Sequence, residues 1–345
     1  MTISLAIKYR PKTWDDVVAQ SSTKIILQQQ LQTGTFKHAY LFCGPAGCGK
    51  TTCARIFANE INKGSGNPIE LDAASNNGVD SVREIIQQAK TRSLDSEYKV
   101  FIIDECHALS NSAWQAMLKI IEEPPAKSIF IFCTTDPQKI PATIISRVQR
   151  YDFQRISQDS IVKRLDWICA NEEIENPDRD IANWPALEYI AKLADGGMRD
   201  AITMLDKCLS YSEDLTLENV ISALGLVSYE FMFSVTTDLM KKRTGQVISS
   251  IETIYADGVD LKQFIKSYIQ FLMDIAKYQL RCDSMFINLP MTETNEQYLA
   301  ELDDYDFIMS LLSTCVKLSE RIKYSATPKM DIESAFMLLI YGETL

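Results

Sequence analysis

Apolar and polar positions alternate in two different ways along the chain, and the change falls near residue 157. In the first part, short apolar runs are separated by stretches whose apolar residues recur at helical spacing. The runs predict strands buried on both faces, and the order predicts a parallel sheet between two layers of helices. The predicted strands are 40–43, 69–73, 99–105 and 128–133, and the predicted helices are 21–31, 52–62, 79–92 and 113–121.

Beyond residue 157 the strand pattern disappears and only amphipathic helical patterns remain. These patterns predict an α/β domain followed by two helical domains, with boundaries at 1–156, 157–226 and 227–345. The predicted helices are 161–171, 184–194, 200–210, 215–224, 230–242, 245–257, 261–282, 295–302, 305–322 and 331–341.

The apolar run at 40–43 leads into a glycine-rich loop of the form G-x-x-x-x-G-K-T and then into a helical pattern. Glycines allow the backbone angles that turn N–H groups inward around phosphate, and the following helix adds the positive end of its dipole. A glycine-rich turn that matches by chance is the alternative, but the strand before and the helix after favour an ATP site. The predicted nucleotide-binding residues here are Gly44, Pro45, Ala46, Gly47, Cys48, Gly49, Lys50, Thr51 and Thr52.

A second candidate site follows at the end of the run 99–105, which closes with Asp104 and Glu105. We expect Lys50 to contact the β- and γ-phosphates, and Thr51 and Asp104 to hold Mg²⁺. Glu105 is the expected residue that polarises the attacking water. The next histidine, His107, completes a D-E-C-H string like that of some helicases, but we interpret it as a solvated turn residue.

Two further polar residues lie at the ends of predicted elements. Thr135 follows the apolar run 128–133, and ligands bind at the carboxyl ends of parallel strands, so its hydroxyl would lie near the γ-phosphate. It fits equally well as a cap of the following turn. Arg199 begins a helix directly after a pair of glycines.

Composition and charge narrow the function classes. No run of about 18 apolar residues and no signal-peptide core occur, so we expect a cytoplasmic protein without a membrane segment. The nine cysteines are scattered without a C-x-x-C pair, which favours reduced thiols over disulfides or zinc. Residues 1–160 carry 18 Lys and Arg against 16 Asp and Glu, and residues 161–345 carry 17 against 30. A net charge of −11 argues against a free-standing DNA-binding module.

Taken together, these motifs resemble the AAA+ clamp-loader ATPases, and in particular the motor region of bacterial DNA polymerase III gamma/tau subunits. The resemblance covers about residues 5–210 with specific motifs, whereas the last helices match in length and type only. The segments that carry it include Tyr9-Arg10-Pro11, the phosphate loop, Asp104-Glu105, Glu122-Glu123-Pro124-Pro125, Thr134-Thr135-Asp136-Pro137, Ser146-Arg147 and Gly197-Met198-Arg199-Asp200.

The resemblance implies a role for each of several residues. Thr135 would be the sensor-1 residue, Arg199 the sensor-2 residue of a helical lid, and Arg147 an arginine finger that acts in trans on the neighbouring subunit's ATP. Residues 227–345 would form a collar that holds an assembly of five subunits, and that assembly would open a sliding clamp and load it on primer–template DNA. The residues that it places near adenine are Tyr9, Arg10, Pro11, Val17 and Val18.

The sequence departs from the family pattern in two places. Residues 59–68 fill the interval where bacterial gamma/tau proteins usually carry a four-cysteine zinc module, so we expect ATP and Mg²⁺ but no zinc. The usual Ser-Arg-Cys is Ser146-Arg147-Val148 here, which keeps the arginine. The chain ends at the collar, which suggests a gamma-like subunit from a phage or a divergent bacterium.

Three alternatives stay open at this point. Another AAA+ nucleic-acid motor, of the Holliday-junction branch-migration type, would need a C-terminal winged helix, and the acidic helices of 229–345 argue against it. A structural subunit that never hydrolyses ATP is disfavoured because Lys50, Glu105 and Arg147 are all present.

The basic residues Arg83, Lys90 and Lys119 are candidate contacts for DNA phosphates, although a solvated helix face explains them equally well.

Overall fold

The computed structural model describes residues 3–91, 93, 95–175, 184–283, 286–287, 289 and 293–342. The chain divides into two compact units, Met1–Leu217 and Glu218–Leu345. The predicted boundary between residues 156 and 157 falls inside the first unit, and the three-domain division remains a prediction.

The first unit contains a five-stranded sheet in which every pair is parallel. The order is β2-β3-β4-β1-β5, so the strand before the phosphate loop lies between β4 and β5. The predicted α/β class with a parallel sheet is therefore confirmed. The strands are β1 (Ala39–Cys43), β2 (Ile69–Asp72), β3 (Lys99–Asp104), β4 (Ser128–Thr134) and β5 (Gln149–Asp152).

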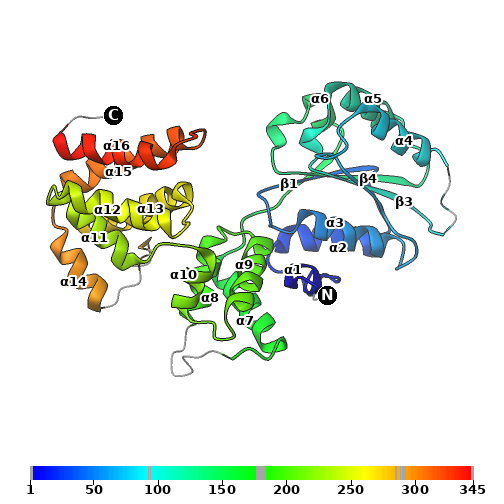
Figure 1. Ribbon diagram of the computed structural model, residues 1–345. Coiled ribbons are helices and arrows are strands. Elements are labelled where there is room, and N and C mark those ends of the chain that lie inside the picture. The colour runs from blue at the N-terminus through cyan, green and yellow to red at the C-terminus, as the bar shows by residue number, and fades with distance from the viewer. Residues whose placement is uncertain are drawn as a thin grey trace. The chain divides into compact units, whose positions relative to one another are not determined.

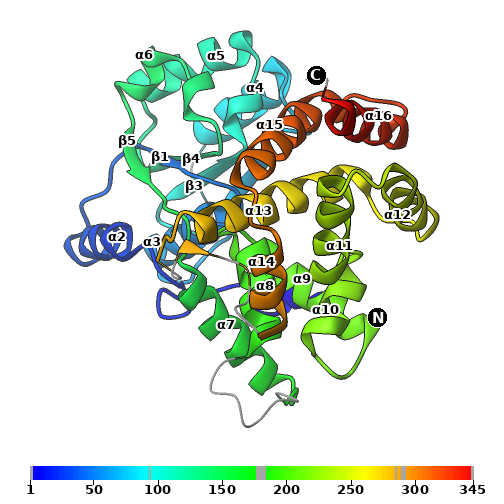
Figure 2. The same ribbon diagram turned by 90° about the vertical axis from the view of Figure 1, so that its left-hand side faces the viewer.

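Helices cover both faces of this sheet, with α2 and α3 on one side and α4, α5 and α6 on the other (Figures 1 and 2). Alternate residues of each strand point to opposite faces. Tyr40 and Phe42 therefore join the core beneath α3, whereas Leu41 joins the core with Val82 and Trp114. The helices of this unit are α1 (Leu5–Lys8), α2 (Ser21–Thr33), α3 (Lys50–Ile61), α4 (Val79–Ala89), α5 (Asn111–Glu122), α6 (Ala142–Ile145), α7 (Gln158–Asn171), α8 (Pro185–Leu193) and α9 (Met198–Tyr211).

The strand β5 and the short helices α1 and α6 of the first unit were not predicted. β5 is an edge strand in which only Tyr151 is buried, so it lacks the apolar run that marked the other strands. α1 is a single turn before Pro11. Among the predicted helices, α4 ends at Ala89 rather than at residue 92, which lies outside the described residues. α7 begins three residues early because the Ser157 hydroxyl accepts a hydrogen bond from Ser160 N and caps it.

The second unit is helical throughout its described residues, as the sequence predicted. Its core is rich in aromatic side chains, with Phe233 and Phe336 almost fully buried and Tyr268 donating or accepting a hydrogen bond with Thr236 at 2.7 Å. Its helices are α11 (Tyr229–Met240), α12 (Thr244–Ala256), α13 (Leu261–Gln279), α14 (Glu293–Glu301), α15 (Tyr305–Ile322) and α16 (Pro328–Tyr341), preceded by α10 (Leu217–Leu224), which begins at the boundary.

Among the described helices, none alone has the length and apolar composition needed to cross a bilayer, and only α10 and α11 taken as one bent pair meet that criterion.

Candidate nucleotide-binding site

The phosphate loop is held between the ends of three strands. Gly44 N donates to Thr134 O at 3.2 Å, and Phe153 N donates to Cys43 O at 2.7 Å. A side chain at Gly44 would bring its Cβ within 2.4 Å of Phe153 O, so only glycine fits against this neighbour. The loop therefore begins from a backbone position fixed by both adjacent strands.

Lys50 lies inside this loop and is almost fully buried. Its Nζ donates to Gly44 O at 2.9 Å and to Pro45 O at 2.7 Å. The loop carbonyls thus satisfy the ammonium group, which places a positive charge within the loop that is predicted to surround phosphate.

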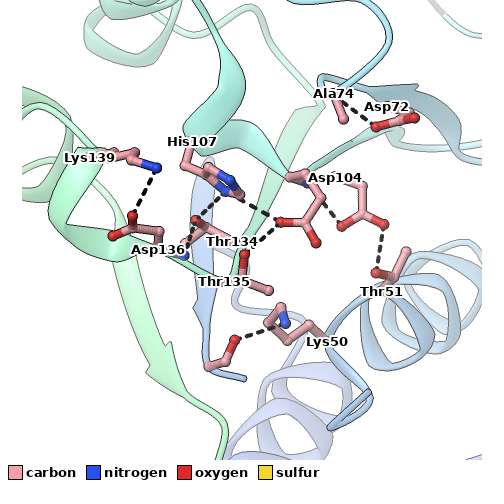
Figure 3. A network of polar contacts seen from close by, with 12 residues as sticks. Lys50, Thr51, Asp72, Ala74, Asp104, His107, Thr134, Thr135, Asp136 and Lys139 are labelled. Carbon is pink, nitrogen blue, oxygen red and sulfur yellow. Dashed lines mark hydrogen bonds and ion pairs between the residues drawn. The ribbon is translucent and has the colours of Figure 1, made fainter. Parts of the chain in front are cut away.

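The two predicted magnesium ligands lie side by side. Thr51 Oγ1, on the first turn of α3, donates to Asp104 Oδ2 at the end of β3 over 2.8 Å (Figure 3). Hydroxyl and carboxylate oxygens are the hard donors that Mg²⁺ prefers, and Mg²⁺ commonly takes only one or two protein ligands beside phosphates and waters. The donor set therefore fits this cation.

Glu105 adopts a left-handed backbone conformation with φ 45° and ψ 42°. Its Oε2 accepts a hydrogen bond from Thr135 Oγ1 at 3.0 Å. The turn after β4 is capped instead by Thr134, whose Oγ1 accepts from Asp136 N at 3.0 Å. Of the two interpretations left open for Thr135, the geometry thus favours the one that directs its hydroxyl to the site.

His107 differs from the sequence-based interpretation as a solvated turn residue. Its side chain is only 20% exposed, and its Nδ1 lies 3.3 Å from Glu105 Oε2 and 3.2 Å from Thr134 Oγ1 (Figure 3). The 3-10 turn η1 (Cys106–Ala108) directs the imidazole toward the end of β4. The D-E-C-H string was the only signal in the sequence that could have pointed to this contact.

Helix α9, the predicted lid helix, begins directly against the phosphate loop. Met198 N donates to Gly47 O at 3.0 Å, and a Cβ added at Gly47, where φ is 70°, would lie 2.8 Å from Gly197 Cα. Arg199 follows on the first turn of α9 with an exposed side chain. Its role as the sensor-2 residue remains a prediction.

The predicted adenine segment contacts both the lid and the loop helix. Tyr9 donates its hydroxyl to Glu172 at the end of α7, and its ring lies edge-on to Trp167 at 5.6 Å. Burial is the main cause that raises the pKa of Tyr9. Pro11 and Val18 are half-buried, whereas Val17 is a buried core residue beneath the sheet.

Arg10 points to the loop helix and donates from Nε to Thr52 Oγ1 at 3.4 Å. Burial, followed by the positive charge of Arg55, lowers the pKa of Arg10, and Arg199 adds to this effect. The carboxylate charges of Glu70 and then of Asp104 act in the opposite direction. Arg10 and Arg199 thus lie close enough to act on each other beside the loop and its helix, which suits a polyanionic ligand.

Arg147 lies apart from this network. It is 40% exposed, and it contacts Thr143 O at 2.8 Å, Ser146 Oγ at 3.1 Å and Glu122 Oε1 at 2.9 Å. These partners belong to the segment of α6 and to the end of α5, on the opposite side of the sheet from α3.

The cysteines around the loop are buried. Burial raises the pKa of the Cys43 thiol to about 11 and that of Cys53 to about 12, and it also raises the pKa of Cys48. Cys48 Sγ donates to Pro45 O at 2.9 Å. Across the described residues, no group of three or more His, Cys, Asp and Glu side chains is arranged to hold a metal ion. The expected absence of zinc remains a prediction.

Gln20 is a residue of this site that no motif indicated. Its Nε2 donates to Gln154 O at 2.7 Å and to Cys48 O at 3.3 Å, and its Oε1 accepts from Gln154 N at 3.0 Å. The side chain thus ties the loop to the segment after β5.

The fold is that of the AAA+ class, and the loop carries the G-x-x-x-x-G-K-T pattern of a phosphate-binding loop. Three-dimensional similarity to the RuvB Holliday-junction branch-migration motor of Thermotoga maritima supports this fold, with a TM-score of 0.53 over 73% of this chain and 86% of that one at 18% identity. Two family models match, "DNA polymerase III, delta subunit" over residues 67–157 and "DNA polymerase III subunits gamma and tau domain III" over residues 215–344.

Curated relatives narrow the class to one family. The chain is 31% identical to the DNA polymerase III gamma subunit of Buchnera aphidicola, covering 97% of this chain and 98% of that one. It is 36% identical to the tau subunit of Bacillus subtilis, covering 95% of this chain and 61% of the relative, and 28% identical to the Escherichia coli tau subunit, covering 96% and 54%. The chain belongs to the DNA polymerase III gamma/tau family of clamp-loader subunits. It spans about half to three-fifths of the length of these tau relatives.

Proposed function

We propose that this chain hydrolyses ATP as one subunit of a clamp-loader assembly. The observation that carries the proposal is the convergence of Lys50, the Thr51–Asp104 pair and the Thr135–Glu105 pair at one edge of the sheet. A family member that only bound nucleotide would not need a carboxylate placed beside the magnesium ligands.

The chain's own residues suggest how the reaction proceeds. The loop N–H groups and Lys50 bind the β- and γ-phosphates, and Glu105 accepts a hydrogen bond from the attacking water and orients it. Thr51 and Asp104 would hold Mg²⁺, which supplies charge neutralisation on the phosphate oxygens. Arg199 adds a cation from α9 of the same chain.

Arg147 is proposed to act on the ATP of a neighbouring subunit. Its exposed position, on the opposite side of the sheet from the chain's own loop helix, supports a role in trans. Such an arginine stabilises the transition state by about 10³–10⁵ in rate. Hydrolysis would then require assembly, which we expect to contain five subunits in the cytoplasm.

The second unit is the proposed assembly domain. α15 exposes Met309 and Val316, and α13 exposes Met273, with the exposed Leu280 at its C-terminal cap. Buried apolar residues fill the other faces of both helices. Apolar side chains spaced seven residues apart lie on one helix face, which suits packing against a second loader subunit.

DNA is a proposed partner of the first unit. A groove of about 580 Å³ lies between α4 and α5, and Arg83, Lys90 and Lys119 line it. Arg83 is paired with the exposed Asp80, so the two lysines are the stronger candidates for contacts with DNA phosphates. Primer–template DNA inside a sliding clamp is the occupant that the family suggests.

The test is ATP hydrolysis by the purified chain with partner loader subunits, with and without a sliding clamp and primed DNA. We expect clamp and primed DNA together to stimulate turnover, and Lys50→Ala to remove it. Lys63→Ala, in the turn after α3, is the matched control. Absence of stimulation, or full activity of Lys50→Ala, would refute the loader function.

A further inference from the structure

One part-buried contact has no role in the proposed hydrolysis, namely the imidazole of His107 beside the carboxylate of Glu105. Nδ1 lies between Glu105 Oε2 at 3.3 Å and Thr134 Oγ1 at 3.2 Å. A carboxylate has no hydrogen to donate, so the contact with Glu105 is attractive when Nδ1 carries a hydrogen.

One hydrogen bond and one close contact reach the same oxygen of Glu105. Thr135 Oγ1 donates to Oε2, and His107 Nδ1 lies 3.3 Å from the same atom, whereas among the described residues no hydrogen bond reaches Oε1. The backbone of Glu105 is in the left-handed region, which a glutamate rarely adopts without support from its surroundings. Both contacts on Oε2 favour one rotation of the carboxylate and leave the other oxygen to accept from water.

The position of His107 is itself fixed by a buried group. Thr134 is fully buried, and its Oγ1 is held by Asp136 N at 3.0 Å. The imidazole thus has a contact on the rigid end of β4 as well as its contact with Glu105 (Figure 3). Asp104 is held separately, since Oδ2 accepts from Thr51 and Oδ1 accepts from Glu105 N.

We propose that His107 is a positioning residue for ATP hydrolysis, which holds the Glu105 carboxylate against the end of β4 with one oxygen directed to the attacking water. This inference rests on the proposed ATPase function. It assigns no contact between His107 and the nucleotide or the metal, so its loss should change turnover and not nucleotide affinity.

The test compares three substitutions of His107 in the complete assembly with clamp and primed DNA. Asn places its amide nitrogen where Nδ1 lies, Gln places it nearer the position of Nε2, and Leu fills a similar volume without a donor. We expect His107→Leu and His107→Gln to lower kcat about tenfold or more, since a small misplacement of a catalytic group is costly. His107→Asn should stay within about threefold of the unchanged protein.

Three further measurements separate positioning from folding. ATP affinity, measured with a fluorescent nucleotide analogue, should change less than about twofold in all three variants. Thermal unfolding tells whether each variant folds. If His107→Leu does not fold, the comparison of the Asn and Gln variants still tests whether a donor at the position of Nδ1 is needed. In a Glu105→Gln background, His107→Leu should cause no further loss, because the carboxylate that it positions is gone.

The possible results are distinguishable. If the unchanged protein does not hydrolyse ATP, the proposed function fails and the inference fails with it. If the unchanged protein is active, two results would rule out a positioning role for His107 and leave the ATPase proposal standing. In one, the kcat values of the Leu and Gln variants equal that of the unchanged protein. In the other, the Asn variant loses as much kcat as the Leu variant.

Discussion

In the first unit, the hydrogen bonds of buried polar side chains join segments that are far apart in the sequence. In the second unit, most buried polar side chains form hydrogen bonds within their own helix or with a neighbouring helix. Gln20 reaches Gln154, and Thr134 meets His107. In the second unit, Asp274 accepts from Lys277 on the same helix, and Asp331 accepts from Arg321 on the preceding one. Polar groups thus cluster at one site in the first unit, whereas in the second unit they hold helices together.

This comparison predicts that substitutions in the two units will have separable effects. Those at the site of the first unit should change turnover or nucleotide binding at nearly constant stability. Those in the core of the second unit should change stability and assembly.

Arg147→Ala should lower ATP turnover of the assembly by about 10³-fold or more, because the finger would act in trans on transition-state charge. Nucleotide affinity of the isolated chain should not change, since Arg147 lies apart from the network around Lys50. Arg150→Ala is the matched control, an exposed arginine on β5 paired with Asp152. Steady-state hydrolysis and nucleotide titration measure both quantities, and equal losses in the two variants would contradict a specific role.

Phe233→Ala should lower the free energy of unfolding of the second unit by about 3–5 kcal/mol, since it leaves a cavity in a close-packed core. The ring is almost fully buried against Phe271 at 4.8 Å and Tyr298 at 5.0 Å. Tyr324→Ala, at an 85% exposed position, should change little. Urea denaturation followed by circular dichroism gives the stability, and ATP titration should show unchanged affinity. A large drop in affinity would argue that the units are not separable.

Buried thiols should make the first unit less stable as the pH rises above about 8.5, where an unfolded cysteine ionises. The folded pKa of Cys53 is about 12, so the unfolded chain releases a proton that the folded chain keeps. The contribution of Cys53 to the free energy of unfolding is complete below about pH 8. Above that pH it falls by about 1.4 kcal/mol per pH unit until the pH reaches the folded pKa of Cys53.

Cys53→Ala should therefore reduce the loss of unfolding free energy between about pH 8 and pH 10 by about 2 kcal/mol. Cys282→Ala removes an exposed thiol in the second unit and should leave that loss unchanged. Denaturation at both pH values is the measurement. An identical pH dependence in all three proteins would disprove the assignment to Cys53.

Gly47→Ala should weaken ATP binding about tenfold, because its Cβ would meet Gly197 Cα at 2.8 Å and disturb the loop. Gly34→Ala is a close control, since Gly34 also has a positive φ, 66°, but open space around its Cβ position. Both variants bear the cost of the left-handed conformation, about 1 kcal/mol. If both bind ATP equally, the contact with the lid has no influence on affinity.

Much of the fold was predictable because buried parallel strands leave unbroken apolar runs. β3 and β4 each carry such a run, and each ends in polar residues that reach the site. The edge strand β5 buries only Tyr151, so its pattern resembles that of a loop. Strand pairing, and not local sequence, makes this segment a strand.

The site was predictable where local motifs define it, as at the phosphate loop and Asp104. His107 was misinterpreted because its second partner, Thr134, lies on another strand, and a single sequence does not reveal such a contact. Gln20 and the bond from Tyr9 to Glu172 were missed for the same reason. Local motifs thus identified the residues predicted to bind and hydrolyse ATP. The residues that keep those side chains in position could be found only from the tertiary structure.

The hydrogen bond from Met198 N to Gly47 O joins two main-chain segments. One partner is itself a glycine, and the other directly follows Gly197. The backbones of Gly47 and Gly197 face each other at this contact, with the Asp200 carboxylate beside them. A displacement of the loop on nucleotide exchange would therefore be transmitted to the first turn of α9 through main-chain atoms. The position of that helix would then be sensitive to the phosphate end of the nucleotide.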